Sequence, residues 1–273
     1  MLSHYKLYVL TIPDSSEIMS KIICIANQKG GVGKTTTAVN LSASLAAANR
    51  KTLLIDADAQ GNSTSGLGID RMLYEKENFY HAMIGKAPLE SVIVETALPN
   101  LDMVPSNQDL VGMEIEFVYL ENRESRLRTL LQSLERSYEF ILIDCPPSLG
   151  FMTVNALVAA DTLIVPLQCE YYALEGLGHL LNTVKLVKAG MNPNLALGGI
   201  LLTMFDPRNT LSHRVTEDVR KHLGRKVFQT VIPRNVRLSE SPSHGLPIIL
   251  YDIKSRGAIA YMELAQEILR GER

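Results

Sequence analysis

A glycine-rich segment with two lysines and two threonines is the part of the sequence with the clearest chemistry. The segment is Lys29-Gly30-Gly31-Val32-Gly33-Lys34-Thr35-Thr36. Glycines let backbone N–H groups close around phosphate oxygens, and the N-terminus of a following helix adds a positive dipole. We expect Lys34 to neutralise the β- and γ-phosphates of ATP and the Thr35 hydroxyl to ligate Mg²⁺. A glycine-rich turn without a nucleotide would explain the glycines, but not the Gly-Lys-Thr-Thr run. The general phosphate-loop template also has glycine at position 28, where this chain has Gln28.

Three aspartates stand where apolar runs end, and they complete this candidate site. Asp56 and Asp58 follow the run Leu53–Ile55, and Asp144 follows the run Ile141–Ile143. In a parallel sheet, acidic residues at the carboxyl ends of strands point into the crevice where Mg²⁺ and phosphate bind. We expect Asp144 and Asp56 to hold Mg²⁺ and Asp58 to orient the attacking water. A single such aspartate is as often a helix cap, so the prediction depends on the three elements occurring together.

Apolar, β-rich runs alternate with longer helical patterns, which is typical of βαβ units around a parallel sheet. The predicted strands are Ile22–Ala26, Thr52–Ile55, Leu101–Val104, Phe140–Ile143, Thr162–Leu167, Gly199–Thr203 and Val227–Val231. The predicted helices are Thr35–Ala48, Arg123–Arg136, Leu174–Lys188, Leu211–Leu223 and Ser255–Arg270. Because the strands are mostly unbroken apolar runs, helices should cover both faces of the sheet. The sequence therefore predicts an α/β fold, a doubly wound and mostly parallel sheet flanked by helices, as one P-loop domain over residues 20–273.

Residues 1–19 differ from the rest of the chain and are expected to form an N-terminal extension. The run Leu7–Ile12 is too short for a secretory signal, and no small-residue cleavage site follows it. Three alternatives remain open at this point. The first is that Met19 is the true start of the protein. The second is a short extension that is disordered or pairs with a sheet edge, and the third is an arm that binds DNA or a partner.

Composition excludes several classes of protein. With 46% hydrophobic residues the chain is too apolar for disorder, and no apolar run approaches the roughly 18–20 residues of a membrane span. Its three cysteines are scattered without a C-x-x-C pair, which favours a reducing compartment and argues against zinc or iron–sulfur sites. The formal net charge of −2 hides an uneven distribution. Residues 71–139 carry 7 basic and 12 acidic side chains, whereas residues 201–260 carry 10 basic and 5 acidic ones.

Taken together, the motifs resemble those of the ParA/Soj family of partition ATPases, within the deviant-Walker-A (SIMIBI) class of P-loop NTPases. The similarity runs from about Lys21 to the end of the chain. The segments that carry it are Ala26–Thr36, Asp56–Asn62, Asp144–Ser148, Val231–Glu240 and Gly245–Ile248. Family members usually have proline where this chain has Ala59, a difference that leaves both neighbouring aspartates in place.

The resemblance implies roles for individual residues. Lys29 matches the signature lysine that reaches the partner's ATP in a nucleotide-sandwich homodimer, and Asp58 matches the carboxylate needed for hydrolysis. With Lys34, these two form the expected catalytic set. A cation placed on the phosphates from the other subunit couples dimerisation to ATP binding, as an arginine finger does. The residues that match the segment beside the adenine base are Met204, Pro233, Arg234 and Asn235.

In that family the ATP-bound dimer binds double-stranded DNA non-specifically, and a ParB-type centromere-binding protein stimulates hydrolysis and release. The basic excess in residues 201–260 fits a face that contacts DNA phosphates. An ordinary solvated surface is the alternative, and Arg234 or Arg237 could instead serve the nucleotide or the dimer. The candidates for DNA contact are Arg208, Arg214, Arg220, Lys221, Arg225, Arg237, Lys254 and Arg256. The resemblance implies a cytoplasmic, nucleoid-associated protein.

Other ATPases of the same class remain as alternatives. A ParA-like ATPase that positions a protein cargo over the nucleoid shares nearly every motif. A MinD-like ATPase needs a basic amphipathic tail to bind a membrane, whereas residues 261–273 contain three Glu and two Arg. We therefore expect the last helix to pack on the sheet and no membrane to be involved. An iron-protein reductase would need thiolate ligands that the chain lacks.

Overall fold

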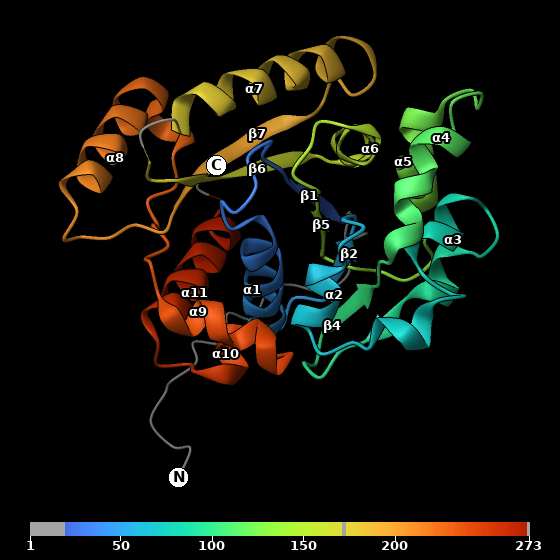
Figure 1. The fold of residues 1–273 in the computed structure, drawn as a ribbon, viewed down its shortest axis with the longest axis horizontal. Helices are drawn as coiled ribbons and strands as arrows, with labels where there is room; N and C mark the ends of the chain where they lie inside the picture. The colour runs from blue at the N-terminus through green and yellow to red at the C-terminus, as the bar shows by residue number, and fades with distance from the viewer. Residues whose placement is uncertain (1–19, 171–172, 272–273) are drawn as a thin grey trace.

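A seven-stranded sheet lies at the centre of the computed structural model, which describes residues 20–170 and 173–271 (Figure 1). The strand order is β3-β4-β2-β5-β1-β6-β7, and every neighbouring pair is parallel except β3 with β4. Residues 1–19, for which we predicted an extension, lie outside the described residues. The strands are β1 Lys21–Ile25, β2 Thr52–Asp56, β3 Val94–Glu95, β4 Leu101–Val104, β5 Phe140–Asp144, β6 Thr162–Gln168 and β7 Ala196–Thr203.

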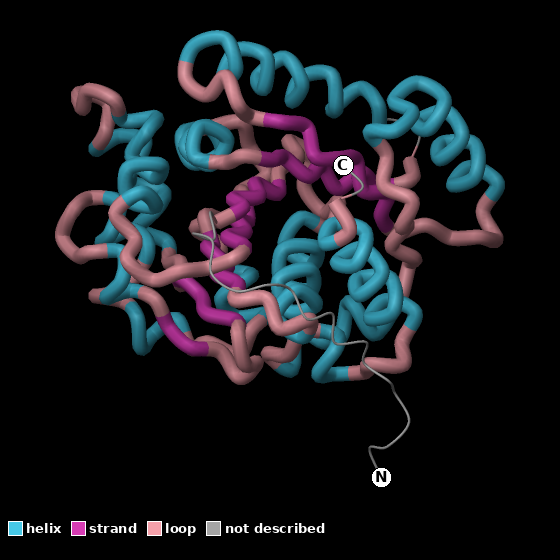
Figure 2. Tube along the Cα trace, turned by 180° about the vertical axis from the view of Figure 1, so that it is seen from behind, coloured by secondary structure: helices cyan, strands magenta, loops and turns pink. Residues whose placement is uncertain are grey.

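Helices cover both faces of this sheet, as Figures 1 and 2 show, and the predicted fold class is confirmed. The α-helices are α1 Lys34–Ala47, α2 Asn62–Gly66, α3 Phe79–Met83, α4 Met113–Glu116, α5 Arg126–Gln132, α6 Phe151–Ala159, α7 Ala173–Gly190, α8 Thr210–Leu223, α9 Val236–Glu240, α10 Ile248–Tyr251 and α11 Arg256–Leu269. Short 3₁₀ helices are η1 Arg71–Tyr74, η2 Leu89–Val92, η3 Gln108–Gly112, η4 Arg123–Ser125, η5 Gly224–Lys226 and η6 Ser241–His244. The predicted helix Arg123–Arg136 is shorter, because the Glu135 N–H leaves the helical pattern and donates to the Glu90 carboxylate at 2.7 Å.

One predicted strand, Val227–Val231, is wrong. This segment runs beside β7 but makes only one isolated bridge, between Ile200 and Val227, and the next bridge, between Phe205 and Pro233, lies beyond its end. In its middle, the N–H groups of Gln229 and Thr230 donate to the Glu267 carboxylate of α11, at 2.9 and 3.0 Å. Because these donors are used by a buried side chain, they are not available for a continuous ladder with β7.

Two hydrophobic clusters hold the helices on the sheet, one on each face. Ile23 and Ile25 of β1 belong to the cluster beneath α1 and α11, while Cys24 and Ala26 belong to the cluster beneath α5, α6 and α7. Successive side chains of a strand point to opposite faces, so a strand covered on both sides becomes apolar throughout. This explains why the strands covered on both faces were predicted from the sequence, whereas the two-residue edge strand β3 was not.

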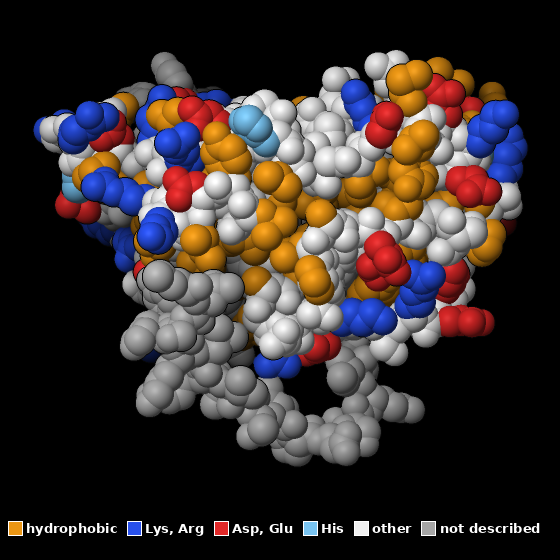
Figure 3. Space-filling view, turned by 90° about the horizontal axis from the view of Figure 1, so that it is seen from below, with side chains coloured by type: hydrophobic (Ala, Val, Ile, Leu, Met, Phe, Trp, Pro, Cys, Tyr) orange, Lys and Arg blue, Asp and Glu red, His pale blue; other side chains and the backbone are white. Residues whose placement is uncertain are grey.

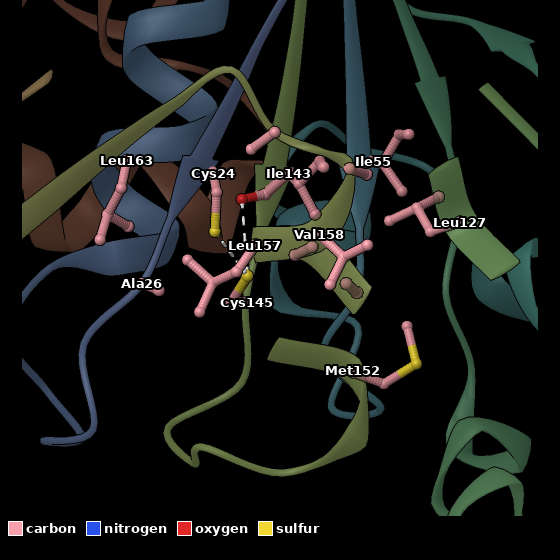
Figure 4. Packing of buried hydrophobic residues seen from close by; sticks show 14 of the residues in the cluster. Cys24, Ala26, Ile55, Leu127, Ile143, Cys145, Met152, Leu157, Val158 and Leu163 are labelled. Carbon is pink, nitrogen blue, oxygen red and sulfur yellow. Dashed lines mark hydrogen bonds between the residues drawn. The ribbon is translucent and has the colours of Figure 1, made fainter. Parts of the chain in front are cut away.

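The cluster beneath α6 contains two neighbouring cysteines. The sulfur atoms of Cys24 and Cys145 lie 3.5 Å apart and pack among Leu157 and Leu163 (Figure 4). Contact with the Cys24 thiol and burial raise the pKa of Cys145 well above its ordinary value. Both thiols therefore behave as small apolar side chains in this core.

The last helix packs inward, in line with the expectation from its charge pattern. Tyr261, Leu264 and Ala265 of α11 are buried in the cluster that also contains α1. The Tyr261 hydroxyl lies 3.2 Å from the Thr37 hydroxyl of α1, directly behind the glycine-rich loop. Across the described residues, no helix combines the length and apolarity that a membrane crossing requires.

The sheet register brings the candidate site residues to one edge. Asp144 lies opposite Asp56 in the β2–β5 pair, while in the β1–β5 pair it lies opposite Ile25, just before the glycine-rich segment. All three strands are parallel, so the segments that follow them emerge together at the carboxyl end of the sheet. The fold thereby collects residues that are up to 115 positions apart in the sequence, from Lys29 to Asp144.

Near α2 the backbone of two glycines makes a close approach. Gly68 and Gly245 have φ angles of 75° and 63°, and a Cβ added to Gly245 would lie 2.6 Å from the Gly68 Cα. This contact holds the segment before α10 against the end of α2. A side chain at either position would meet both an unfavourable left-handed backbone and a steric clash.

We expect Gly245→Ala to lower the free energy of unfolding by about 2–4 kcal/mol, from left-handed strain and overpacking. The matched control is Gly178→Ala in α7, where the added Cβ meets nothing within 4 Å. That control should raise stability by about 0.5–1 kcal/mol through helix propensity. Urea denaturation of the nucleotide-free protein measures both changes, and equal stability of the two variants would contradict the close approach.

Candidate active site

The glycine-rich loop between β1 and α1 is held open by contacts to the strands beside it. The Asn27 amide donates to the Pro166 carbonyl at 2.7 Å, and the Thr203 hydroxyl donates to the Val32 carbonyl at 2.8 Å. Gly31 and Gly33 have φ angles of 71° and 89°, a conformation that favours glycine. Gly33 forms the N-terminal cap of α1, so free backbone N–H groups and the helix dipole face the loop. The loop therefore has the shape and polarity of an anion cradle.

Lys34 supplies the positive charge inside this cradle. Its side chain is buried, and the ammonium group donates to the Lys29 carbonyl at 3.1 Å across the loop. Burial lowers the pKa of Lys34, while the negative charges of Asp144 and Asp58 raise it. Because the Lys34 side chain is already held in this position, it can contact a phosphate group in the loop without changing its conformation.

Asp144 is the residue best placed to bind a metal ion. One of its carboxylate oxygens accepts a hydrogen bond from the Ser63 hydroxyl at 2.7 Å, and the other is buried without a hydrogen-bond partner. Burial raises the pKa of Asp144 to about 6, although the hydroxyls of Ser63 and Thr35 act in the opposite direction. A buried carboxylate that has one oxygen without a hydrogen-bond partner and is influenced by the Thr35 hydroxyl fits a hard cation such as Mg²⁺.

Asp56 lies beside Asp144, but its oxygens are already used within the protein. One oxygen accepts the Asp58 N–H at 3.2 Å, and the other accepts both the N–H and the hydroxyl of Thr64, at 2.9 and 2.8 Å. Burial and the neighbouring charge of Asp144 raise the pKa of Asp56 to about 8. These contacts fix the start of α2 and the segment that carries Asp58.

Asp58 is held from both sides at the edge of the site. Its carboxylate accepts the Gln60 N–H at 3.0 Å, and its carbonyl accepts the Ser106 hydroxyl at 2.7 Å. The side chain is 8% exposed, so it is largely desolvated yet open to the crevice. A carboxylate with this support can orient a water molecule for attack on a phosphate.

Lys29 projects from the loop and pairs with a residue that sequence analysis missed. Its ammonium group lies 2.8 Å from the Glu170 carboxylate, and both side chains are nearly half exposed. Glu170 follows β6, and the Gln168 amide donates to its other carboxylate oxygen. A signal for this pair was available, because a charged residue that follows a buried strand at the same edge is expected near the loop.

Two of the four predicted base-side residues line a cavity next to Glu170. Met204 and Arg234 border this cavity of about 610 Å³. Asn235 does not; its side chain caps α9 by accepting the Leu238 N–H, and Pro233 bridges to Phe205. Among the described residues, no group of three or more His, Cys, Asp or Glu side chains could by itself hold a metal ion. A cation here would take further ligands from the nucleotide and from water.

The eight basic candidates for DNA contact fall into two groups. Three are engaged within the protein: Arg208 with Asp206, Arg220 with the carbonyls of Phe228 and Gln229, and Arg237 with Glu240 and Asp252. The side chains that are exposed and have no ion pair among the described residues are Arg214, Lys221, Arg225, Lys254 and Arg256. Lys221 and Arg225 stand together where α8 ends and η5 begins.

The raised pKa values of the aspartate pair predict how stability depends on pH. Aspartates of the unfolded chain lose their protons near pH 4, whereas Asp56 keeps its proton up to about pH 8. The folded state therefore holds more protons in this window, and the free energy of unfolding falls as the pH rises through it. In Asp56→Asn we expect this fall between about pH 6 and 8 to be smaller, by about 1–2 kcal/mol.

Urea denaturation at the two pH values, without nucleotide or Mg²⁺, measures the difference. Asp109→Asn removes an exposed carboxylate and is the matched control, which should keep the wild-type pH dependence. If Asp56→Asn and wild type depend equally on pH, the pair is not protonated in the folded state.

Comparison with known proteins agrees with this geometry. A family model described as an AAA domain matches residues 20–197. The chain is 54% identical over 256 residues to the chromosome partitioning protein ParA of Myxococcus xanthus, covering 92% of this chain and 89% of that protein. It is also 54% identical to the sporulation initiation inhibitor protein Soj of Bacillus subtilis, covering 92% and 98% of the two chains.

Solved structures place the fold in the same class. Cobyrinic acid a,c-diamide synthase from Mycobacterium smegmatis, solved with ADP and magnesium, superposes with a TM-score of 0.82 at 37% identity, covering 92% of this chain and 95% of that one. A plasmid partition protein from Borrelia burgdorferi bound to AMPPNP gives 0.80 at 28% identity, covering 93% and 100%. With this fold, this loop and these relatives, the chain belongs to the ParA/Soj family of chromosome-partitioning P-loop ATPases.

Proposed function

We propose that residues 20–273 form one ATPase domain that couples ATP binding and hydrolysis to reversible binding of DNA. The observation that carries this proposal is the convergence of the glycine-rich loop, Lys34, Asp144 and Asp58 at one edge of the sheet. The names of the relatives favour the chromosome as cargo. A protein cargo is the alternative, and the genes that neighbour this one distinguish the two.

ATP would bind with its phosphates in the loop formed by Lys29–Thr36 and its base in the cavity beside Met204 and Arg234. Lys34 and the N-terminus of α1 are placed to neutralise the β- and γ-phosphates. Thr35 and the unpartnered oxygen of Asp144 would hold Mg²⁺, which supplies charge neutralisation at the transferring phosphate. Asp56 acts mainly by fixing Asp58 and α2, although we expected it to be a metal ligand.

Hydrolysis would depend on Asp58 and on a second copy of the chain. Asp58 orients the attacking water, and Lys29 leaves Glu170 to reach the phosphates of the partner subunit. A homodimer with ATP between its subunits would therefore be the active state. This arrangement agrees with Lys29 being exposed, whereas Lys34 is buried.

The dimer would bind double-stranded DNA through the exposed basic residues at the end of α8 and the start of α11. These residues carry no base-reading pattern, so the contact would be to phosphates and independent of sequence. A ParB-type centromere-binding protein would stimulate hydrolysis and release the dimer from DNA. The protein would thus act in the cytoplasm, on the nucleoid.

The DNA face is tested by the double variant Lys221→Glu/Arg225→Glu. We expect strong DNA binding by the wild type with ATP and weak binding with ADP or no nucleotide. In the double variant the log–log salt dependence should become shallower by about 0.9 for each phosphate that the protein no longer neutralises. Filter binding at two salt concentrations in the three nucleotide states measures both effects.

The control for this experiment is Lys76→Glu/Lys86→Glu, which makes the same charge change at two exposed lysines outside the proposed face. The proposed face is wrong if both double variants lose the same affinity. If the wild type binds DNA equally with ATP, with ADP and without nucleotide, the protein is an ATPase whose DNA binding is not controlled by the nucleotide.

The role of Asp58 is tested by Asp58→Ala and Asp58→Asn. Both should lower ATP turnover about 100-fold or more, because the group that orients water is lost. Both should still bind ATP and stay on DNA, since Lys34 and the loop are unchanged. Asp58→Asn keeps an acceptor for the Gln60 N–H, so a loss shared by both variants is due to the charge and not to the loop. Wild-type turnover in either variant would remove Asp58 from catalysis.

A further inference from the structure

The segment after β4 has apolar side chains on two sides, but only one side is buried in the hydrophobic core. Leu110, Met113 and Phe117 are buried in the core and anchor η3 and α4. On the outside, large apolar side chains are exposed by 51–94%, namely Val111, Ile115, Val118, Tyr119 and Leu120. We call these five residues the α4 surface. Such a dense group of exposed apolar side chains marks an interaction site more often than a feature of folding.

Charge around the α4 surface limits what can bind there. Residues 105–122 contain four acidic residues and no Lys or Arg. Glu121 is exposed, and the Glu116 carboxylate accepts the Tyr80 hydroxyl at 3.0 Å. Figure 3, seen from below, shows hydrophobic side chains among both acidic and basic ones on the side of the molecule where α3 lies in Figure 1. DNA and anionic membranes would be repelled by an acidic rim, whereas a basic amphipathic segment of a protein would be attracted.

Two connections lead from the α4 surface to the candidate active site. Ser106, just before η3, donates its hydroxyl to the Asp58 carbonyl at 2.7 Å and its N–H to the Thr64 hydroxyl at 3.1 Å. On the other side, Phe117 of α4 packs edge-to-face on Phe151, with ring centroids 5.4 Å apart. Phe151 begins the helix that follows Asp144. A partner on α4 would therefore contact a segment that is fastened to the supports of both aspartates.

We propose that the α4 surface is the docking site of the partner that stimulates hydrolysis, and that the partner binds it with a basic amphipathic segment. The inference deepens the proposed function and rests on it. A second copy of this chain is a poorer occupant, because a symmetric contact would bring two acidic rims together. Docking would stimulate turnover by shifting Ser106 and the Asp58 carbonyl that it holds.

The test uses Ile115→Ser/Tyr119→Ser and the single variant Glu121→Lys. All three positions are exposed, so stability should change by less than about 0.5 kcal/mol. Leu186→Ser in α7, at a site 72% exposed, is the matched control. The probe is a ParB-type protein from the same organism, bound to its centromere DNA. The readouts are basal ATPase, ATP-dependent dimerisation by sedimentation, DNA retention and the partner concentration for half-maximal stimulation.

We expect both α4 variants to require about tenfold more partner for half-maximal stimulation, as replacement of a central interface residue does. Their basal ATPase, dimerisation and DNA retention should match the wild type and Leu186→Ser. The proposal would be overturned if the double variant were stimulated at the same partner concentrations as the wild type. It would also be overturned if the double variant lost ATP-dependent dimerisation, because the α4 surface would then be the contact with a second copy of the chain. If the partner does not stimulate even the wild type, the partner assigned in the proposed function is wrong, and so is the docking site.

Discussion

Two carboxyl groups buried side by side are the constraint on which the rest of this structure depends. Asp56 and Asp144 are paired across β2 and β5, and both are fully buried. Burying two neighbouring carboxylates costs free energy unless bound protons, hydrogen-bond donors or cations compensate their negative charges. The protein provides hydroxyl groups from Ser63, Thr35 and Thr64, and it provides Lys34, but it leaves one Asp144 oxygen without a partner. That oxygen is free to accept the cation that we propose there, and in its absence the raised pKa values of both aspartates favour a shared proton.

The acidic and the basic segments of the chain belong to different elements of the fold. The acidic middle segment runs from after β2 to just before β5 and includes the α4 surface, while the basic late segment includes the end of α8 and the start of α11. Dimerisation would double both surfaces, one suited to phosphates and the other to a basic protein segment. The two segments nearly cancel in the net charge of −2 for the whole chain, so that number describes neither of them.

Sequence patterns predicted the parts of the fold that depend on local or periodic signals. Strands buried on both faces appear as apolar runs, and the loop, Lys34 and the three aspartates follow from their place at strand ends. Two features could not be predicted because they depend on distant partners. The Glu267 carboxylate diverts the backbone of Val227–Val231, and backbone carbonyls occupy Arg220. The pair of Lys29 with Glu170 was missed, although Glu170 follows a buried strand at the same edge. The exposure of the α4 surface was also hidden, since a sequence does not show which face of a short apolar helix is covered.

The contrast between the two lysines of the loop follows from their surroundings. Lys34 is buried and held by the Lys29 carbonyl, which suits the proposed role on the nucleotide of its own subunit. Lys29 and Glu170 form an ion pair in which both side chains are nearly half exposed, and such a pair contributes at most about 1 kcal/mol. This weak contact keeps Lys29 ordered in the free subunit but is readily exchanged for the concentrated negative charge of a triphosphate. In the proposed cycle, the buried lysine would bind ATP within one subunit, whereas the exposed lysine would respond reversibly to a second subunit.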